Sequence, residues 1–282
     1  MMELHELHLP TNHREVVSRF LAACQADDRI VAAFLGGSYA TNHADIYSDL
    51  DLYFVTTDSS YQEFPTEKEY FVRQLGVPLF LTDFGNLHGS FFILSNGAEG
   101  EIWFGRESDF TNIHSGAYIV LLDKNNILAG QVFSTPTAEL SEQRELLRRQ
   151  IDGFWHELSH FIKAMGRQQL WFAYGQIEVM RRMCVLLARL KYNFSDPYLD
   201  ENEPYFKIEH ALPIETLSPL QSTFCPMEYA AMLQTAKVIC RFYQDIAPAL
   251  AKVHELSYQP DLERMLIKQL RDLPQFPSSL NH

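Results

Sequence analysis

Two aspartates, Asp49 and Asp51, are the residues whose types and spacing most clearly suggest chemistry. They flank Leu50 at the start of an apolar run, so in a strand both carboxylates lie on one face. Two carboxylates on one face repel each other unless a cation lies between them. Mg²⁺ suits such oxygen ligands and shares its coordination shell with substrate phosphates. Two such ions, about 3.5–4 Å apart, can hold the attacking and leaving oxygens of a phosphoryl transfer.

A glycine-rich turn precedes the aspartates. Gly36, Gly37 and Ser38 follow an apolar run that ends at Leu35. Glycine lets the backbone turn sharply and approach a ligand closely. Ser38 has a residue type that is preferred at a helix N-cap, and the first amides of a helix are free to bind phosphate oxygens. Alone, each motif is equally typical of an ordinary turn or of two solvated aspartates, but their order and spacing together are a strong signal.

Residues 35–54 resemble the signature of the DNA polymerase beta-like nucleotidyltransferases. More narrowly, they resemble the antibiotic nucleotidyltransferases that act on aminoglycosides and lincosamides. The resemblance implies that Gly37 and Ser38 hold the phosphates of a nucleoside triphosphate. It also implies that Asp49 and Asp51 are catalytic and bind two Mg²⁺ ions.

The same family needs a third carboxylate from a neighbouring strand, and two residues are candidates. Residues 100–104 and 118–123 are similar to later strands of lincosamide-type members, and Glu101 begins an apolar strand within the first of these segments. Asp83 instead ends a strand and precedes a turn-forming sequence. We therefore favour Glu101 as the third catalytic, metal-binding carboxylate. The alternative for either residue is a surface acid at the end of a strand.

One glutamate in the second half is a candidate for binding the acceptor. Residues 176–190 resemble a helix of the aminoglycoside adenylyltransferases, which implies that Glu178 helps to bind the acceptor. The alternative is an ordinary i,i+4 ion pair between Glu178 and Arg182 on the helix surface.

The elements that must position these residues follow from the apolar patterns. Short apolar runs in the first half predict strands at residues 30–35, 51–56, 78–82, 90–94, 101–104 and 118–122. Apolar residues at three- and four-residue spacing predict helices over 13–25 and 67–75, and in the second half over 139–165, 168–192, 227–247 and 261–270. The proline-containing link between the helices of the second half is expected to be irregular.

These patterns predict an α+β fold with two domains. An N-terminal mixed-sheet nucleotidyltransferase domain is expected at residues 1–135, followed by a C-terminal helical-bundle domain at 136–282 that binds the acceptor. The boundary is placed at Pro136, because this residue and the small polar residues before it interrupt both patterns.

The composition excludes several classes of partner. The formal net charge of −13 disfavours a nucleic-acid ligand and suits a cationic partner, or an anion that arrives with a metal. No apolar stretch reaches the length of a membrane span, and residues 1–5 lack the pattern of a signal peptide. The four cysteines form no CxxC pair, which indicates a reducing, cytoplasmic location. Whether the chain is a monomer or a dimer stays open.

The sequence therefore predicts a metal-dependent enzyme that transfers a nucleoside monophosphate, with AMP expected, from a nucleoside triphosphate to a hydroxyl group. The acceptor is expected to be a small molecule, with aminoglycoside and lincosamide antibiotics favoured by the resemblance. The alternatives are nucleotidylation of a protein target and a non-catalytic regulator that binds nucleotide. The acceptor, the base of the nucleotide and the general base are left open.

Overall fold

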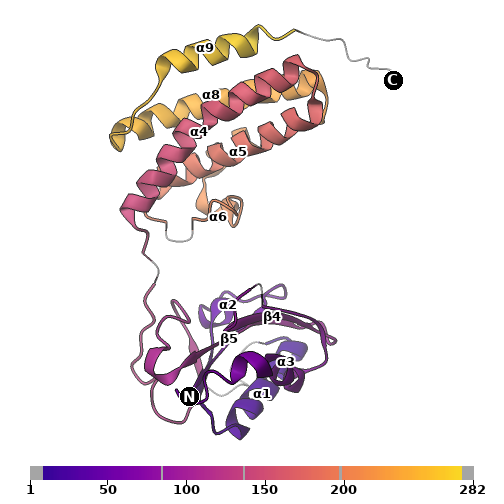
Figure 1. Cartoon of the computed structure of the whole chain (residues 1–282), viewed down its shortest axis with the longest axis vertical. Coiled ribbons are helices and arrows are strands. Elements are labelled where there is room, and N and C mark those ends of the chain that lie inside the picture. The colour runs from indigo at the N-terminus through magenta and orange to yellow at the C-terminus, as the bar shows by residue number, and fades with distance from the viewer. Residues whose placement is uncertain (1–8, 84, 136, 197–198, 275–282) are drawn as a thin grey trace. The chain divides into compact units, whose positions relative to one another are not determined.

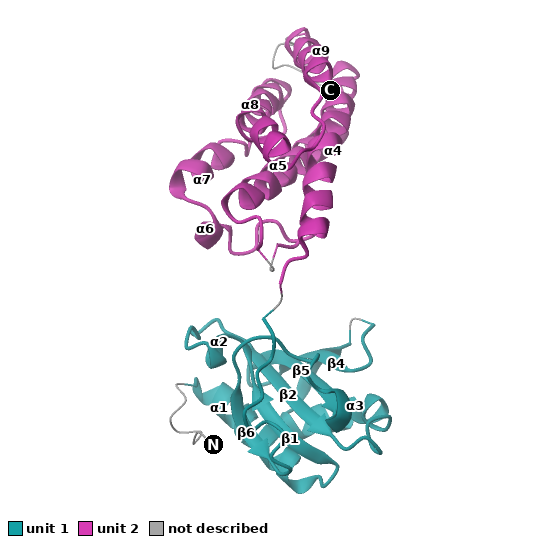
Figure 2. Ribbon diagram, turned by 90° about the vertical axis from the view of Figure 1, so that its left-hand side faces the viewer, with its two compact units in different colours: residues 1–136 teal, residues 137–282 magenta. Residues whose placement is uncertain are grey.

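The computed structural model describes residues 9–83, 85–135, 137–196 and 199–274 (Figure 1). The chain divides into two compact units, residues 1–136 and 137–282 (Figure 2). The first unit contains a mixed sheet and the second is helical, so the predicted α+β fold class is confirmed. Pro136, at which the domain boundary was placed, lies outside the described residues.

The first unit follows the predicted order of helices and strands. Its elements are α1 (Thr11–Ala26), β1 (Ile30–Leu35), α2 (Gly37–Ala40), β2 (Leu50–Thr56), α3 (Phe64–Leu75), β3 (Pro78–Thr82), β4 (Gly89–Leu94), β5 (Glu99–Arg106), a 3₁₀ turn (Glu107–Asp109) and β6 (Ile119–Asp123). All the predicted strands are present, and their ends differ from the predicted ones by at most two residues. One difference affects the site, because β2 begins at Leu50 and leaves Asp49 just outside the strand.

The strands form one six-stranded sheet in the order β3-β4-β5-β2-β1-β6. Only β2 and β5 pair in parallel, and the other neighbours are antiparallel. In the parallel pair, Asp51 lies directly opposite Glu101. Directly paired residues of neighbouring strands project from the same face of a sheet. The topology therefore brings these two carboxylates, fifty residues apart in the sequence, to one place.

The two faces of the sheet are covered differently. On one face, Leu52, Phe54 and Phe104 pack with Phe20 of α1 and Phe71 of α3, and Figure 1 shows both helices on this side of the sheet. A smaller apolar cluster covers part of the other face; it consists of Val31, Ala32, Phe34, Val55, Phe110, Leu128 and Phe133. The polar residues Asp51 and Glu101 of β2 and β5 project from this second face, where the start of the short helix α2 lies against Asp51.

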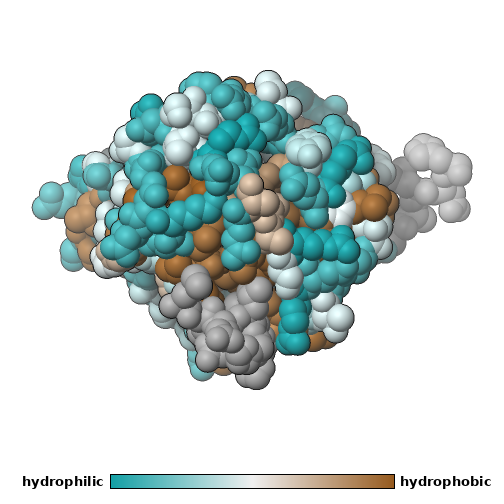
Figure 3. Space-filling model, turned by 90° about the horizontal axis from the view of Figure 1, so that it is seen from below, coloured by the Kyte–Doolittle hydropathy of each residue, from teal (hydrophilic) through white to brown (hydrophobic). Residues whose placement is uncertain are grey.

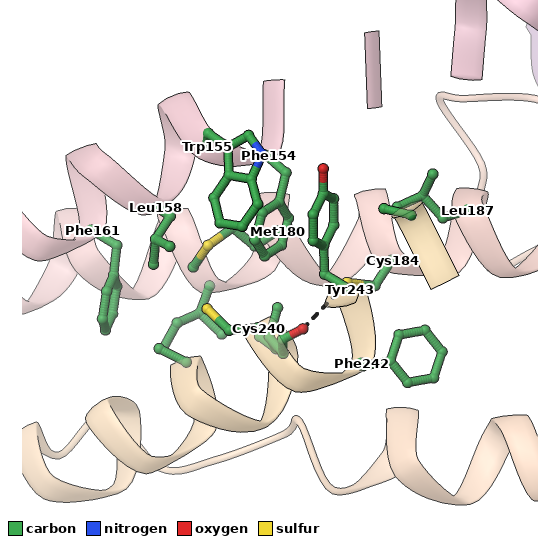
Figure 4. Packing of buried hydrophobic residues seen from close by; sticks show 14 of the residues in the cluster. Phe154, Trp155, Leu158, Phe161, Met180, Cys184, Leu187, Cys240, Phe242 and Tyr243 are labelled. Carbon is green, nitrogen blue, oxygen red and sulfur yellow. Dashed lines mark hydrogen bonds between the residues drawn. The ribbon is translucent and has the colours of Figure 1, made fainter. Parts of the chain in front are cut away.

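The second unit is built from long helices and shorter connecting ones. They are α4 (Leu140–Gly166), α5 (Leu170–Tyr192), α6 (Ile208–Ala211), α7 (Ile214–Gln221), α8 (Tyr229–Val253) and α9 (Pro260–Arg271). Phe154 of α4 stacks on Tyr243 of α8 with ring centroids 3.8 Å apart, next to Met180 and Cys184 of α5 (Figure 4). The apolar stripe of α5 is therefore core, as the pattern predicts. The Tyr243 hydroxyl donates to the carbonyl of Ile151 at 2.8 Å, which satisfies a buried polar group.

The link before α8 is more regular than predicted. It contains α6 and α7, so the prediction of an irregular segment is wrong there. Pro213 is the N-cap of α7, where a missing N–H removes no helical hydrogen bond. Pro219 lies inside α7, but Leu212 and Leu220 enter the core. Apolar packing thus stabilises a short helix that local sequence preferences disfavour.

One face of the molecule shows how polar and apolar residues are distributed on its surface. The face seen in Figure 3 is mainly hydrophilic, with apolar residues gathered near its centre, and a mixture of this kind is normal for folded proteins. Among the helices that the structure describes, none combines the length and the apolar character needed to cross a bilayer.

Candidate active site

Asp51 and Glu101 form the centre of the candidate site. They occupy the same register position on the parallel strands β2 and β5, and both side chains are half-buried. Burial, together with the charges of Asp49 and Glu101, raises the pKa of Asp51 to about 6. The ionised carboxylate of Asp51 is thus disfavoured unless a cation compensates it.

The glycine turn lies against Asp51. The amide of Gly36 donates to the carbonyl of Asp51 at 2.9 Å. Gly37 has a φ of +60°, and a Cβ atom added to it would lie 1.7 Å from Asp51 Oδ2. Glycine is therefore required at position 37 for two reasons, the left-handed backbone and the contact with the carboxylate.

Ser38 differs from the prediction in its local role. It was expected at the N-cap of a short helix, but the N-cap of α2 is Gly36 and Ser38 lies inside the first turn. The reason is that the chain already turns at Gly37, one residue earlier. The Ser38 hydroxyl is buried and has no hydrogen-bond partner among the described residues. A buried hydroxyl without a partner, one residue after Gly37, leaves a hydrogen bond for a ligand oxygen to complete.

Asp49 is placed differently from Asp51. Because β2 begins at Leu50, the alternation of strand side chains does not fix the direction of Asp49, and the expectation that both aspartates lie within one strand is wrong. Asp49 is exposed. Its charge still contributes to the raised pKa of Asp51, so the two residues are electrostatically coupled.

The chemistry of these donors fits a divalent metal ion. Asp51 and Glu101 supply hard oxygen ligands from adjacent strands, and Asp49 adds negative charge beside them. Within the described parts of the chain, no three or more His, Cys, Asp or Glu side chains already form a closed metal-binding group.

The two carboxylates face a hollow of about 500 Å³. Its lining consists of Gly37, Asp51, Tyr53, Glu101, Trp103, Asn112, Ile113, His114 and Ser115. The volume lies within the usual range for small-molecule sites. The sequence analysis missed Tyr53 and Trp103, although each lies two residues beyond a predicted carboxylate and strand alternation places it on the same face. No comparable signal identifies residues 112–115, which belong to a loop.

His114 forms a neutral, polar part of the wall. Its Nε2 lies 2.9 Å from the carbonyl oxygen of Ala117, and a carbonyl can only accept, so Nε2 carries the proton. Burial lowers the pKa of His114, which leaves the ring neutral at pH 7 with Nδ1 as an acceptor. The ring packs 4.7 Å from that of Tyr53.

Asp83 belongs to a different region. Its carboxylate accepts a hydrogen bond from Lys68 of α3 at 3.3 Å. Asp83 and Lys68 line a separate hollow of about 420 Å³ together with other residues of α3, β3 and β4. The structure therefore brings Glu101 to Asp51, while Asp83 pairs with a lysine of the helix-covered side.

Glu178 has a different ion-pair partner from Arg182, the residue that i,i+4 spacing suggests. Its partner is Arg181, three residues along α5, whereas Arg182 donates to backbone carbonyls of the following loop. The expected pair with Arg182 is therefore wrong. Tyr205 also donates to Glu178, at 3.0 Å. Arg181 is the partner because it is held in place: its side chain is 3 % exposed and donates twice to Thr223.

The model of the family described as streptomycin adenylyltransferase matches residues 11–87 and 105–273, which is most of the chain. Among solved structures, an aminoglycoside 6-adenyltransferase from Bacillus subtilis is similar at 15 % identity over 94 % of this chain and 99 % of that chain, with a TM-score of 0.43. No curated protein sequence matches. Gly37, Ser38, Asp49 and Asp51 lie within the matched residues, whereas Glu101 lies between the two matched stretches.

Proposed function

Because the chain belongs to the streptomycin adenylyltransferase family, it is a nucleotidyltransferase, and we propose that it transfers AMP from ATP to a hydroxyl group of an aminoglycoside. The observation that carries the proposal is the pair of carboxylates, Asp51 and Glu101, in register beside the Gly37 turn. The unpartnered Ser38 hydroxyl supports the same site.

Each residue has a separate role in the proposed reaction. The backbone at Gly37 and the hydroxyl of Ser38 hold phosphate oxygens. Asp49, Asp51 and Glu101 would hold two Mg²⁺ ions, which would screen the triphosphate charge and lower the pKa of the acceptor hydroxyl. The hollow positions the reactants, and positioning supplies a large part of the rate of such transfers.

The transfer itself is an in-line displacement at the α-phosphorus. A bond forms between the acceptor oxygen and the α-phosphorus, and the bond from that phosphorus to the bridging oxygen of the β-phosphate breaks. Pyrophosphate leaves with the electron pair, and the hydroxyl proton passes to a base. The acceptor approaches within the hollow, whose lining includes residues 112–115.

The charge of the protein favours a cationic acceptor. A formal net charge of −13 attracts a polycation such as an aminoglycoside and increases its rate of association. In this proposal the first unit carries the nucleotidyl transfer and the second unit binds the acceptor. Glu178, whose side chain is 40 % exposed, contributes hydrogen-bond acceptors to that binding.

A pyrophosphate-release assay tests the proposal. The purified chain, ATP and Mg²⁺ are incubated with streptomycin, other aminoglycosides and a lincosamide, and each product is examined by mass spectrometry for one added AMP. We expect release with at least one aminoglycoside, none when EDTA is present, and none from Asp51→Asn. Asp83→Asn is the matched control and should stay active.

Other results would identify the alternatives. Adenylation of a lincosamide alone would keep the reaction and change the acceptor class. Labelling of proteins in a cell extract, with no small-molecule product, would favour a protein target. An increase in melting temperature with ATP and Mg²⁺, but no pyrophosphate with any acceptor, would indicate a nucleotide-binding regulator.

A further inference from the structure

We propose that Trp103 is a positioning residue that orients the carboxylate of Glu101, and that position 89 is a glycine because the indole ring of Trp103 needs its space. This inference rests on the proposed function, in which Glu101 is a metal-binding residue. It adds two residues to the site, neither of which contacts the reacting atoms.

The first observation is a hydrogen bond within β5. Trp103 Nε1 lies 2.8 Å from Glu101 Oε2. The two residues are separated by one position and therefore share a face of the sheet. An indole nitrogen can only donate, so the carboxylate must be the acceptor. One oxygen of Glu101 is thus fixed by the indole, while the other stays available to a cation.

The second observation is the space that Gly89 provides. Gly89 is paired with Trp103 across the antiparallel β4 and β5. A Cβ atom added to Gly89 would lie 2.4 Å from Cζ3 of the indole, 2.5 Å from Cε3 and 2.7 Å from Cη2. The six-membered ring of Trp103 therefore lies directly against the backbone of Gly89, where any other residue would displace it.

Backbone conformation does not explain this glycine. The described glycines with a φ between +20° and +160°, where L-residues are strained, are Gly37, Gly85, Gly97, Gly116 and Gly130. Gly89 is not among them, so its backbone is open to any L-residue and the only constraint is the neighbouring ring. The glycine at position 89 thus provides the space in which the indole ring lies, and the hydrogen bond from the indole fixes the orientation of the Glu101 carboxylate.

Such a hydrogen bond has a chemical consequence for the site. Hydrogen-bond partners of metal-binding side chains orient them, and removing such a partner typically lowers metal affinity or activity about 10–100-fold. Glu101 is half-buried and needs one defined orientation to share an ion with Asp51 on the next strand. Residues 88–104 lie between the two stretches that the family model matches, so the match does not include Gly89, Glu101 or Trp103.

The main test is Trp103→Phe, which keeps an aromatic ring on Gly89 and removes the N–H donor. We expect kcat to fall about 10–100-fold, with a much smaller change in the KM for the acceptor. A second readout does not depend on turnover: the Mg²⁺ concentration at which a non-hydrolysable ATP analogue raises the melting temperature should increase by a similar factor. The melting temperature without ligands should change little.

A second variant perturbs the same hydrogen bond from the other strand. Gly89→Ala should displace the indole and reproduce both effects of Trp103→Phe. In the double variant the two effects should not add, because each removes the same interaction. Gly166→Ala is the matched control, since its Cβ would meet only Leu273 at 3.9 Å, and it should behave as wild type.

The results separate this inference from the proposed function. If Trp103→Phe and Gly89→Ala keep the wild-type kcat and the wild-type Mg²⁺ midpoint while Asp51→Asn is inactive, the positioning role is wrong and the transferase stands. If no acceptor yields pyrophosphate, the proposed function fails, and the Mg²⁺ midpoint with the ATP analogue still decides the role of Trp103. If Trp103→Phe does not fold, Gly89→Ala provides the same comparison.

Discussion

Asp51 is held in a position that is unfavourable for its own charge. It is half-buried, and both Asp49 and Glu101 add negative charge beside it, so that its pKa is raised to about 6. A carboxyl group whose pKa is higher in the folded state than in the unfolded chain favours folding when protonated. The stabilisation by protonated Asp51 is fully present below pH 3.8, the pKa of an aspartate in the unfolded chain. It is lost as the pH rises through about 6, the pKa of Asp51 in the folded protein.

We therefore predict that Asp51→Asn abolishes transfer and stabilises the metal-free protein. In EDTA at pH 8, the free energy of unfolding of the variant should exceed that of wild type by roughly 2 kcal/mol, and the difference should shrink toward pH 4. Urea denaturation at both pH values measures this. A variant that is active, or less stable than wild type at pH 8, would contradict the electrostatic account of the site.

The Gly37 turn gives a second prediction at this scale. Gly37→Val should abolish ATP binding, because its side chain meets Asp51 Oδ2 and its φ of +60° is strained for a branched residue. Ser38→Ala should be milder and weaken binding by about tenfold. The stability of the ATP-free protein should be unchanged by Ser38→Ala, since that hydroxyl has no partner among the described residues. Calorimetry with a non-hydrolysable analogue provides the measurement, and normal binding by Gly37→Val would place the phosphates elsewhere.

The sequence predicted part of this residue-scale picture. Gly37, Asp51 and Glu101 line one hollow, because Gly37 directly follows β1 and the two acids lie on the neighbouring strands β2 and β5. Trp103 could also have been inferred from strand alternation. The loop of residues 112–115 could not, because its path over the sheet depends on aromatic packing far along the chain and follows no local period.

At the scale of the elements, the parallel pairing of β2 and β5 decides which acid joins Asp51. We predict that Glu101→Gln lowers kcat at least about 100-fold, with little loss of stability. Asp83→Asn should change neither property much, because it removes only a partly exposed ion pair with Lys68. Steady-state kinetics and thermal unfolding of both variants give the comparison. If Asp83→Asn lowered kcat and Glu101→Gln did not, the third carboxylate would be Asp83.

The helix α5 gives a prediction for the second unit. Arg181 is buried, donates twice to Thr223 and lies 4.0 Å from the centroid of the Phe224 ring. Arg181→Met should lower the free energy of unfolding by roughly 2–3 kcal/mol, because buried acceptors lose their donor.

The matched variant Glu178→Gln separates structure from binding. Glu178 is 40 % exposed, so its loss should change stability by less than about 1 kcal/mol. If it binds the acceptor, the KM for the acceptor should rise. Urea denaturation measures the stability, and titration with the acceptor measures its KM. If Glu178→Gln lost as much stability as Arg181→Met, the assignment of a structural role to Arg181 and a binding role to Glu178 would be wrong.

Periodicity explains why most elements could be predicted. The buried strand β1 and the long helices α4, α5 and α8 have strong apolar patterns, and their ends were found closely except at the C-terminus of α8. The helix α7 was missed because its prolines indicate a loop, whereas burial of Leu220 stabilises the helix. Tertiary packing of this kind does not appear in a local pattern.

At the scale of the whole molecule, each unit has its own hydrophobic core. The largest cluster consists only of residues beyond 145, and the two clusters around the sheet consist only of residues before 134. We predict that a fragment of residues 1–136 folds alone and binds ATP in a Mg²⁺-dependent way, but does not transfer AMP. Circular dichroism and calorimetry test this, and an unfolded fragment would show that the first core is insufficient.

The parallel pairing also bears on how such a protein varies between lineages. Seven consecutive register pairs join β2 to β5, and neighbouring strands lie ~4.8 Å apart by the geometry of the peptide backbone. The separation of Asp51 and Glu101 is therefore set by main-chain hydrogen bonding and not by the particular side chains that fill the core. Inherited substitutions in the core should change how many molecules per cell are folded, while each folded molecule keeps the same turnover. Transferase activity per cell among natural variants would then follow protein abundance more closely than kinetic constants.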